Sequence, residues 1–453
     1  MLKKFTALII IAILAGSLVA CNTEIPETVE FSSASSATLD NATKSEMKTE
    51  STTAAETEAA TTSEQTTSAQ QTTTSGSKKS AQQTESVITT ANTTSTGMIN
   101  ATELFTNRDL TQNADLTDAK YYTVSDGQNI NITSEGVYVI SGSASNVTIT
   151  VDAGDNDKVQ IVLDGVSITN SSSPCIYVKN ADKVFVTTTS TDNALSVTGT
   201  FTADGTTNTD AVIFSRDDLV INGLGTLTIN STDNGISCKD DLKVTGGTIT
   251  INCSSDGLEA NDSIAIADGS ITISTSKDGL HAENDDDNTT GYVYICGGTL
   301  NITAGDDGIH ATTVAQIDGG TMNITAAEGI EGAFVQINSG TIGITSSDDG
   351  INGSNKSSAY SVTVEINGGD ITINMGQGDT DAIDSNGNLH INGGTLNISA
   401  SSPFDYDGQA SYTGGTMIVN GSQTTTITNQ MMGGGMGGMG GMHNDGGAGF
   451  PGR

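Results

Sequence analysis

The stretch "GGTLNITAGDDGIHA", residues 297–311, decides the fold because edited copies of it recur along the chain at a near-constant spacing. The chain repeats it as "GGTMNITAAEGIEGA" at 319–333 and as "NSGTIGITSSDDGINGS" at 338–354. Alignment of these and related segments gives one glycine column, formed by Gly235, Gly257, Gly279, Gly308, Gly329 and Gly350. The column spacings are 22, 22, 29, 21 and 21 residues, with a further 32 to Ala382. The chain is therefore a repeat protein with two insertions in an otherwise regular period.

Each period contains three short runs in which apolar and polar residues alternate, for example "YVYI", "TLNIT" and "GIHAT". This alternation predicts strands, and three such strands in every 21 to 22 residues predict one coil of a parallel β-helix. In the second run we expect Leu300 and Ile302 to point inward and Asn301 outward. Parallel crossover connections are right-handed, which sets the sense of the coil. The predicted fold class is all-β, a right-handed parallel β-helix with three strands per coil.

A Gly-Gly pair separates the first two runs of a coil at 246–247, 297–298, 319–320, 368–369 and 393–394. We expect a positive φ within each pair, because a tight corner needs a conformation that glycine adopts without strain. The sequence does not contain the signatures of other repeat folds. Neither the LxxLxLxxN unit of leucine-rich repeats nor the GGxGxD unit of calcium-binding nonapeptide repeats occurs.

The composition divides the chain into five parts. Residues 1–21 have the basic start and apolar run of a signal peptide, and "LVAC" at 18–21 resembles a bacterial lipobox, which predicts a lipid on Cys21. An ordinary secretory signal is the alternative. Residues 22–97 hold few large apolar side chains and are predicted to be a disordered linker. We expect a cap at 98–135, the β-helix at 136–428 and a disordered Met- and Gly-rich tail at 429–453.

The charge and the signal sequence together predict where the protein works and which partners it excludes. A formal net charge of -36 argues against nucleic acid, whose phosphates need the Lys and Arg that are scarce here. The predicted location is the extracellular face of the cell membrane, held only by the N-terminal lipid, with the linker reaching into or beyond the cell wall. We expect a monomer. Divalent cations are the natural partners of such a surface.

Four cysteines follow Cys21, namely Cys175, Cys238, Cys253 and Cys296. An even number in an exported protein raises the alternative of disulfide pairs. Their repeat positions favour free thiols instead, because Cys238 and Cys253 fall on different strands and Cys296 falls at a turn.

Acidic residues stack on the position before the glycine column. Neighbouring coils of a β-helix lie about 4.8 Å apart, so ionised carboxylates stacked at this position repel one another by roughly 1 kcal/mol even in water. Either some of them are protonated or cations lie between the coils. Outside a cell the hard cation Ca²⁺ suits oxygen ligands, and the alternative is that Asp serves here as a good turn residue. The predicted Ca²⁺ ligands are Asp256, Glu259, Asp278, Asp306, Asp307, Glu331, Asp348, Asp349 and Asp381.

Two histidines, His281 and His310, occupy neighbouring positions in the outward column of the third strand. We interpret them as exposed side chains of a carbohydrate-binding face, together with Tyr294, and a transition-metal or catalytic pair is the alternative. The Met-rich tail, with Met436, Met439, Met442 and His443, offers a soft-metal site as an alternative to a flexible segment.

Residues from about 103 to 428 resemble a family of clostridial secreted carbohydrate-binding proteins. The resemblance is carried by "ELFTNRDLTQNADLTDAKYYTVSDG", "GVYVISGSASN", "KVQIVLDGVSITN", "KDDLKVTGGTITI", "KDGLHAENDDDN" and "GQGDTDAIDSNG". It implies a right-handed parallel β-helix with bound Ca²⁺, similar to pectate-lyase folds. It also implies binding of plant cell-wall polysaccharide, such as cellulose or polygalacturonate, without known catalysis.

The absence of Trp and the scarcity of other aromatic residues favour an acidic uronan over cellulose, because flat cellulose is usually bound by exposed rings. The predicted function is Ca²⁺-dependent, non-catalytic binding of such a polysaccharide. One alternative is a Ca²⁺-dependent pectate lyase, for which Lys277, Lys239 or Lys243 would have to act as the base. A structural or adhesive surface rod that binds no glycan is the other alternative.

Overall fold

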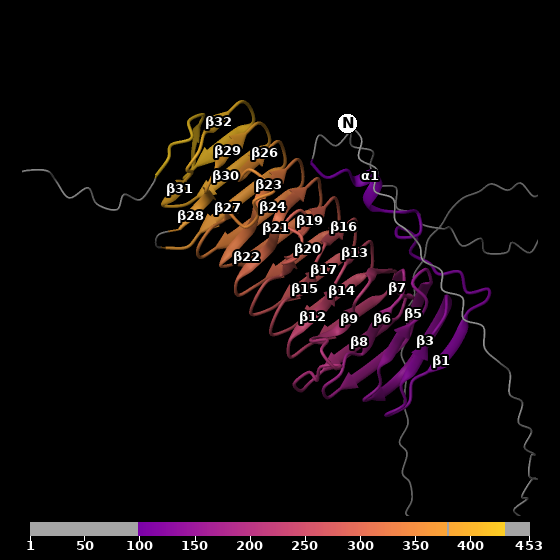
Figure 1. Cartoon of the computed structure of the whole chain (residues 1–453). Helices are drawn as coiled ribbons and strands as arrows, with labels where there is room; N and C mark the ends of the chain where they lie inside the picture. Colours follow the sequence, from indigo (N-terminus) through magenta and orange to yellow (C-terminus); the bar gives the residue numbers. More distant parts are fainter. Residues whose placement is uncertain (1–97, 378–379, 431–453) are drawn as a thin grey trace, which may run out of the picture. The chain divides into compact units, whose positions relative to one another are not determined.

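The computed structural model describes residues 98–377 and 380–430, and they form a long stack of parallel strands (Figure 1). Equivalent strands of successive coils pair in register, so Leu280 lies between Leu258 and Ile309. The predicted all-β class is confirmed, because α1 (Ala101–Leu104) is the only helix in the described ranges. The pairing is that of a parallel β-helix with three strands per coil, and its right-handed sense stays a prediction. The predicted signal peptide, Cys21 lipid and linker, and residues 431–453 of the tail, lie outside the described residues.

The strands form three faces that we number by their order within a coil. Face 1 contains β1 (Lys120–Thr123), β3 (Gly136–Ser145), β5 (Lys158–Asn170), β7 (Lys183–Thr188), β10 (Asp218–Gly223), β13 (Asp241–Val244), β16 (Ser263–Ile266), β19 (Tyr292–Ile295), β26 (Thr363–Ile366), β29 (Asn388–Ile391) and β32 (Ala410–Tyr412). β3 and β5 continue from face 1 round the corner into face 2. Two other long strands, β21 (Asp307–Ile317) and β23 (Glu328–Ile337), begin on face 3 and continue round the corner into face 1.

Face 2 contains β8 (Asp192–Val197), β11 (Thr226–Asn230), β14 (Thr248–Asn252), β17 (Ser270–Ser274), β20 (Thr299–Thr303), β22 (Thr321–Ala326), β24 (Thr341–Ser346), β27 (Asp370–Met375), β30 (Thr395–Ser399) and β33 (Thr416–Val419). It ends in β34 (Ser422–Thr424), which pairs antiparallel with β33. Face 3 contains β2 (Ile130–Ile132), β4 (Ile149–Asp152), β6 (Ile176–Asn180), β9 (Ala211–Ser215), β12 (Asn234–Cys238), β15 (Leu258–Ala260), β18 (Leu280–Ala282), β25 (Ile351–Gly353), β28 (Asp381–Ser385) and β31 (Ser402–Phe404). Parallel pairing thus begins at Lys120, upstream of residue 136.

Aliphatic side chains stacked from coil to coil form the core. Leu300 and Ile302 of β20 are buried and Asn301 between them is exposed, as the alternation predicts. The same holds for Met322 and Ile324 of β22, which stack directly on Leu300 and Ile302. In-register stacking of branched side chains removes them from water at every coil, and this burial is the main stabilising contribution of the fold.

Glycine serves two different purposes at the corners. The second residue of each predicted Gly-Gly pair has a positive φ, for example 88° at Gly247 and 84° at Gly298, which confirms that prediction. The column glycines are needed for space. A Cβ on Gly279 would lie 2.6 Å from the carbonyl oxygen of Gly308 and 2.5 Å from Cγ2 of Ile302. Successive coils therefore approach more closely at this corner than a side chain permits.

Residues 98–112, which we call the strap, lie along the outside of face 1. The backbone N–H of Ile99 donates to Oε1 of Gln316 at 2.7 Å, and the ring of Phe105 lies 6.5 Å from that of Tyr294. At the other end of the strap, Nε2 of Gln112 donates to the carbonyl oxygen of Thr245 at 2.9 Å. The sequence predicts a cap of the first coil at 98–135, whereas this part runs along the side of the stack, because the outward rings of face 1 need a cover.

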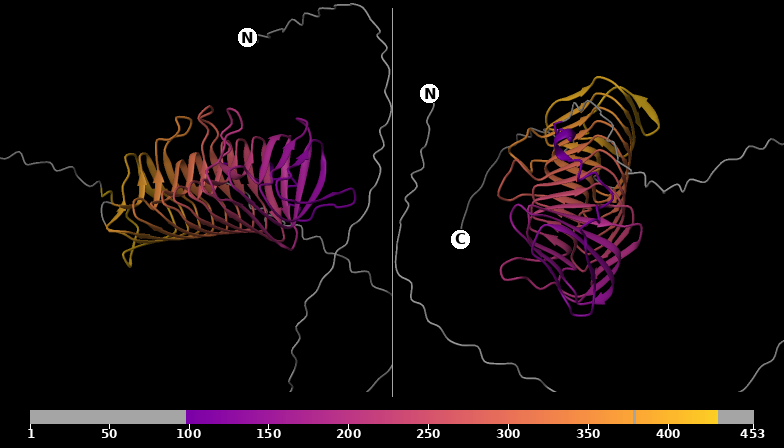
Figure 2. Two further views of the ribbon diagram at one scale, coloured as in Figure 1. Left: turned by 90° about the horizontal axis from the view of Figure 1, so that it is seen from below. Right: turned by 90° about the vertical axis from the view of Figure 1, so that its right-hand side faces the viewer.

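The two insertions in the period form loops that contact each other. Nδ2 of Asn288 donates to Oγ of Ser358 at 3.0 Å, and Oγ of Ser357 donates to the carbonyl oxygen of Asn288 at 2.7 Å. Figure 2 shows loops standing out from the regular stack of coils.

The predicted free thiols are confirmed at Cys175, Cys238, Cys253 and Cys296. Within the residues that the structure describes, no helix is long and apolar enough to cross a membrane.

Candidate functional site

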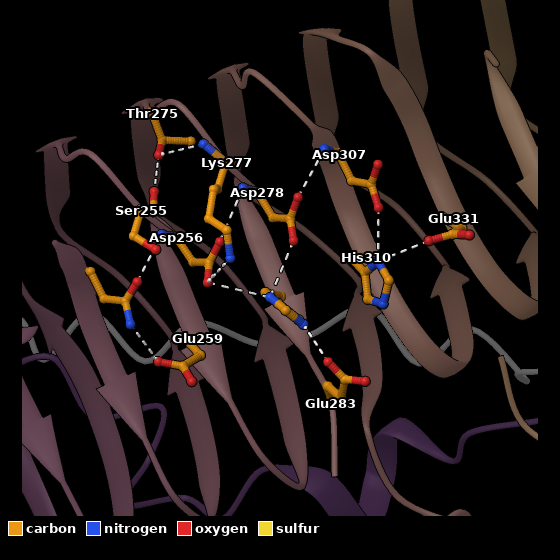
Figure 3. A network of polar contacts seen from close by, with 12 residues as sticks. Ser255, Asp256, Glu259, Thr275, Lys277, Asp278, Glu283, Asp307, His310 and Glu331 are labelled. Carbon is orange, nitrogen blue, oxygen red and sulfur yellow. Dashed lines mark hydrogen bonds and ion pairs between the residues drawn. The ribbon is translucent and has the colours of Figure 1, made fainter. Parts of the chain in front are cut away.

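The acidic column lies where face 2 turns into face 3, at the same point of successive coils (Figure 3). Asp256 and Asp278 precede β15 and β18, while Asp307 and Glu328 open β21 and β23. The outward side chain three residues after each column acid joins this column, and at two successive coils it is His281 and His310. The structure therefore brings four of the predicted ligands and the two histidines into one continuous site, namely Asp256, Asp278, Asp307 and Glu331 with His281 and His310.

At three corners of the column, one aspartate oxygen holds the backbone of the next coil. Oδ1 of Asp256 accepts the backbone N–H of Asp278 at 3.1 Å, and Oδ1 of Asp278 accepts that of Asp307 at 2.9 Å. Further along, Oδ1 of Asp349 accepts the N–H of Asp381 at 3.2 Å. Each coil thus fixes the carboxylate of the coil before it, and the second oxygen, Oδ2 of Asp256, Asp278 and Asp307, is directed toward the histidines.

Three groups of side chains within the described residues bring potential metal ligands within 4.8 Å of one another. They are Asp256 with Asp278 and His281, then Asp278 with Asp307 and His310, and then Asp307 with Glu328 and Glu331. The first two contain an imidazole nitrogen, and the third contains carboxylate oxygens alone. Successive groups share Asp278 and Asp307, so the site is continuous along the stack.

His310 is buried between two carboxylates. Its Nδ1 lies 2.7 Å from Oδ2 of Asp307 and 2.8 Å from Oε2 of Glu331. Burial acts to lower the pKa of His310, but the hydrogen bonds to both carboxylates outweigh it and raise the pKa to about 10. Burial acts to raise the pKa of Glu331, and the hydrogen bond and charge of His310 instead hold it at about 2. The expected exposed position of His310 is wrong, because this charge pairing draws the ring into the column.

Glu328 was not among the predicted ligands, although its place before Gly329 in the glycine column could have identified it. Nδ2 of Asn352 donates to Oε2 of Glu328 at 2.9 Å. Burial and the charges of Glu331, Asp307 and Asp349 raise the pKa of Glu328 to about 7. The Oδ1 atom of Asn352 is buried and has no hydrogen-bond partner. Asn352 is paired in register with Glu331, so an unused oxygen lies beside the all-carboxylate group.

The other predicted ligands lie outside the three groups. Glu259 forms an ion pair with Lys239 at 2.9 Å and accepts from Nδ2 of Asn234 at 2.8 Å. Asp306 and Asp348 are exposed. Asp349 lies further along the stack, where burial and the charges of Asp384, Asp348 and Asp381 raise its pKa to about 7.

Tyr294 does not belong to this site. It lies on β19 of face 1, where it is only 1% exposed beneath the strap, and its hydroxyl donates to Oδ2 of Asp318 at 2.9 Å. The expected position of Tyr294 on an exposed carbohydrate-binding face is therefore wrong. The alternation of "YVYI" correctly directs this ring outward, but it gives no signal for the distant segment that covers it.

Face 2 offers a different kind of surface. Its outward positions form in-register columns of hydroxyl and amide side chains, such as Thr299 stacked between Ser270 and Thr321. A hollow of about 480 Å³ lies at its N-terminal end and is lined by residues including Ser167, Asn193 and Thr228. This surface is uncharged over most of its area and is separate from the acidic column.

A family model of carbohydrate-binding domain-containing proteins matches residues 126–333 and 328–433. The chain belongs to this family. The match includes the acidic column and face 3 from β2 to β31, so the resemblance noted in the sequence is confirmed.

A curated carbohydrate-binding domain-containing protein from Acetivibrio thermocellus is 40% identical to the chain over 124 residues, which is 26% of this chain and 43% of the relative. The match therefore spans less than half the length of that relative. A solved structure, the gadolinium derivative of a polysaccharide lyase-like protein from C. thermocellum, is 32% identical, with a TM-score of 0.46. The match covers 48% of this chain and 96% of that one.

Proposed function

We propose that the protein binds an acidic polysaccharide of the plant cell wall, such as polygalacturonate, through Ca²⁺ held on the acidic column. The family supports carbohydrate as the class of ligand. The observation that carries the proposal is the convergence of Asp307, Glu328 and Glu331 within 4.8 Å of one another. His310 supplies one positive charge to these three carboxylates, so the group needs a further cation or stays partly protonated.

The chemistry of this group suits Ca²⁺. Hard cations of this size take six to eight oxygen ligands, and carboxylates with an amide carbonyl are the usual protein donors. Asp307, Glu328 and Glu331 would supply carboxylate oxygens, and the unpartnered Oδ1 of Asn352 would supply a neutral one. When bound, the ion would offer its remaining positions to the carboxylates of a uronan. The raised pKa of Glu328 supports the same assignment, because a bound cation relieves the crowding of like charges.

The composition of the site favours an acidic polymer over a neutral one. Stacking on aromatic rings is the common way to hold a flat neutral glucan, and Tyr294, the predicted ring, is buried on another face. Lys277 and Lys356 stand at the edge of the column, with side chains 56% and 44% exposed, where they can meet the carboxylates of an acidic ligand. An acidic chain would thus find both the bridging ion and two half-exposed ammonium groups, although each already lies near a carboxylate of the column, Lys277 near Asp256 and Lys356 near Glu331.

We propose binding without catalysis. A lyase needs an unpaired base beside the ion, and Lys239 is occupied by Glu259 at 2.9 Å. Lys277 is the one observation in favour of the enzyme alternative, since its Nζ lies 4.0 Å from Oδ2 of Asp256 and its side chain is largely exposed.

We also propose that a lipid on Cys21 attaches the protein to the outer face of the membrane, which metabolic labelling with a fatty acid would reveal.

The test compares retention of the whole chain on immobilised polygalacturonate and on cellulose, each in calcium and in chelator. The proposal predicts retention on polygalacturonate that a chelator abolishes. Equal retention in chelator, or retention on cellulose alone, would contradict it. The same samples are monitored for unsaturated uronide by ultraviolet absorbance. Steady release of that product from polygalacturonate, lost in Lys277→Ala, would instead establish the lyase.

A further inference from the structure

Three potential metal-ligand atoms converge at one point of the acidic column, two coils away from the all-carboxylate group. Nδ1 of His281 lies 3.1 Å from Oδ2 of Asp278 and 3.4 Å from Oδ2 of Asp256. Asp256 and Asp278 are only 4% and 6% exposed, so water screens these charges weakly. The two carboxylates come from successive corners, and the imidazole comes from β18 on face 3, in the same coil as Asp278.

The second nitrogen of His281 has a partner of its own. Nε2 lies 3.1 Å from Oε2 of Glu283, which is two residues further along the same coil (Figure 3). When Nε2 donates its proton to this carboxylate, Nδ1 presents a lone pair to the two aspartate oxygens. Three acceptors facing one another repel unless a metal ion or a proton lies between them. A carboxylate that holds the far nitrogen of a histidine is also the usual support of a metal-binding imidazole.

The two aspartates are held ready for a ligand role. The backbone N–H of Asp278 orients Asp256, and the backbone N–H of Asp307 orients Asp278. Both donors belong to the parallel stack, so the carboxylate orientations follow from strand register and do not depend on the ion. The donor set of one imidazole nitrogen and two carboxylate oxygens is therefore built into the fold.

We propose that Asp256, Asp278 and His281 form a site for a divalent transition-metal ion of the Zn²⁺ class, with Glu283 as the positioning residue. A mixed nitrogen and oxygen set suits such ions, whereas Ca²⁺ prefers oxygen alone. Three protein ligands leave coordination positions open for water or for a hydroxyl or carboxylate of a bound sugar. This assignment does not rest on the calcium proposal, which concerns the all-carboxylate group two coils further along and shares no ligand with this site.

The test is calorimetric titration of Zn²⁺ into the whole chain, stripped of metal and held at pH 8 in excess Ca²⁺ so that sites of oxygen alone are already filled. Wild type is expected to bind one Zn²⁺ at this site. His281→Gln should weaken binding at least 10-fold, and Glu283→Gln by about 10-fold through loss of ring positioning. The matched control is His390→Gln, whose ring contacts Ser411 on face 1 at 2.8 Å and which should bind as wild type does.

Co²⁺ provides a second readout, because its visible spectrum reports nitrogen coordination directly. The spectrum should appear with wild type and disappear with His281→Gln. Thermal unfolding in Ca²⁺ checks that the variant is folded. Equal Zn²⁺ affinity in wild type and His281→Gln would overturn the proposal. The absence of Zn²⁺ binding to folded wild type would also overturn it, because a proton on Nδ1 of His281 would then be enough to join the ring to the two aspartates.

Discussion

Nδ1 of His310 lies 2.7 Å from Oδ2 of Asp307, three residues earlier on the same coil. Both side chains are buried, so the contact is an ion pair within the column and not a surface interaction. Glu331 of the next coil approaches the same nitrogen at 2.8 Å. The carboxylate column is therefore partly neutralised by an imidazolium ion, and only the charge left over requires added cations.

Replacement of His310 by Gln should destabilise the metal-free protein in a pH-dependent way. The folded pKa of about 10 lies above the usual value near 6.5, so the stabilisation is fully present below pH 6.5 and disappears as the pH rises through 10. At pH 6.5 the loss should be about 3 kcal/mol, because a buried charge pair is broken. Denaturant unfolding in chelator at pH 6.5 and pH 10 measures both values.

The control for this substitution is His390→Gln, since His390 lies on face 1 beside Ser411. The difference in unfolding free energy between wild type and His310→Gln should shrink toward zero at the higher pH. A difference that is constant across this range would show that His310 stabilises the protein by packing alone.

The glycine column should be intolerant of even one added methyl group. In Gly279→Ala the new Cβ would lie 2.6 Å from the carbonyl oxygen of Gly308, and backbone cannot move aside without shifting a coil. We expect a loss of about 2 to 3 kcal/mol in unfolding free energy. Gly343→Ala is the control, because its Cβ would meet its nearest atom, Oδ1 of Asn323, at 3.4 Å. Equal stability of the two variants would show that close approach of the coils does not require glycine.

The strap should contribute measurably to stability through Gln112. Its Oε1 accepts the backbone N–H of Gly223 at 2.9 Å, and its Nε2 donates to the carbonyl oxygen of Thr245 at 2.9 Å. Gln112→Ala leaves both buried backbone groups unpaired, which should cost about 2 kcal/mol. The exposed Gln128 supplies the control Gln128→Ala, expected to be neutral within about 0.5 kcal/mol. Thermal or denaturant unfolding that fails to separate the two variants would mean that the strap is not bound in solution.

Contacts between equivalent positions of successive coils could be predicted from the sequence, because a fixed period converts sequence spacing into spatial adjacency. The burial of Leu300 beside Met322 and the meeting of Asp278 with Asp307 both follow from the alignment alone. Contacts that break the period could not be predicted. The strap meets Gln316 across a separation of 217 residues, and no pattern in the sequence marks that partner, so Tyr294 was wrongly expected at the surface.

The neutralisation of the acidic column by His310 could not be predicted from the sequence either. The alignment stacks His310 between His281 and Glu331 but does not say which way the ring turns. That choice depends on the competition between burial, which favours a neutral ring, and two carboxylates within hydrogen-bond distance, which favour a charged one. Only the side-chain geometry decides it.

The most direct test of calcium-dependent binding at this column is retention of the whole chain on immobilised polygalacturonate as the free Ca²⁺ concentration is raised, for wild type and for Glu328→Gln. The substitution removes one charge from the all-carboxylate group, and Glu135→Gln, an exposed position on another coil, is the matched control. We predict that half-maximal retention of Glu328→Gln needs at least 10-fold more Ca²⁺ than wild type, while Glu135→Gln follows wild type. Coincident curves for all three proteins, or retention independent of Ca²⁺, would contradict the account.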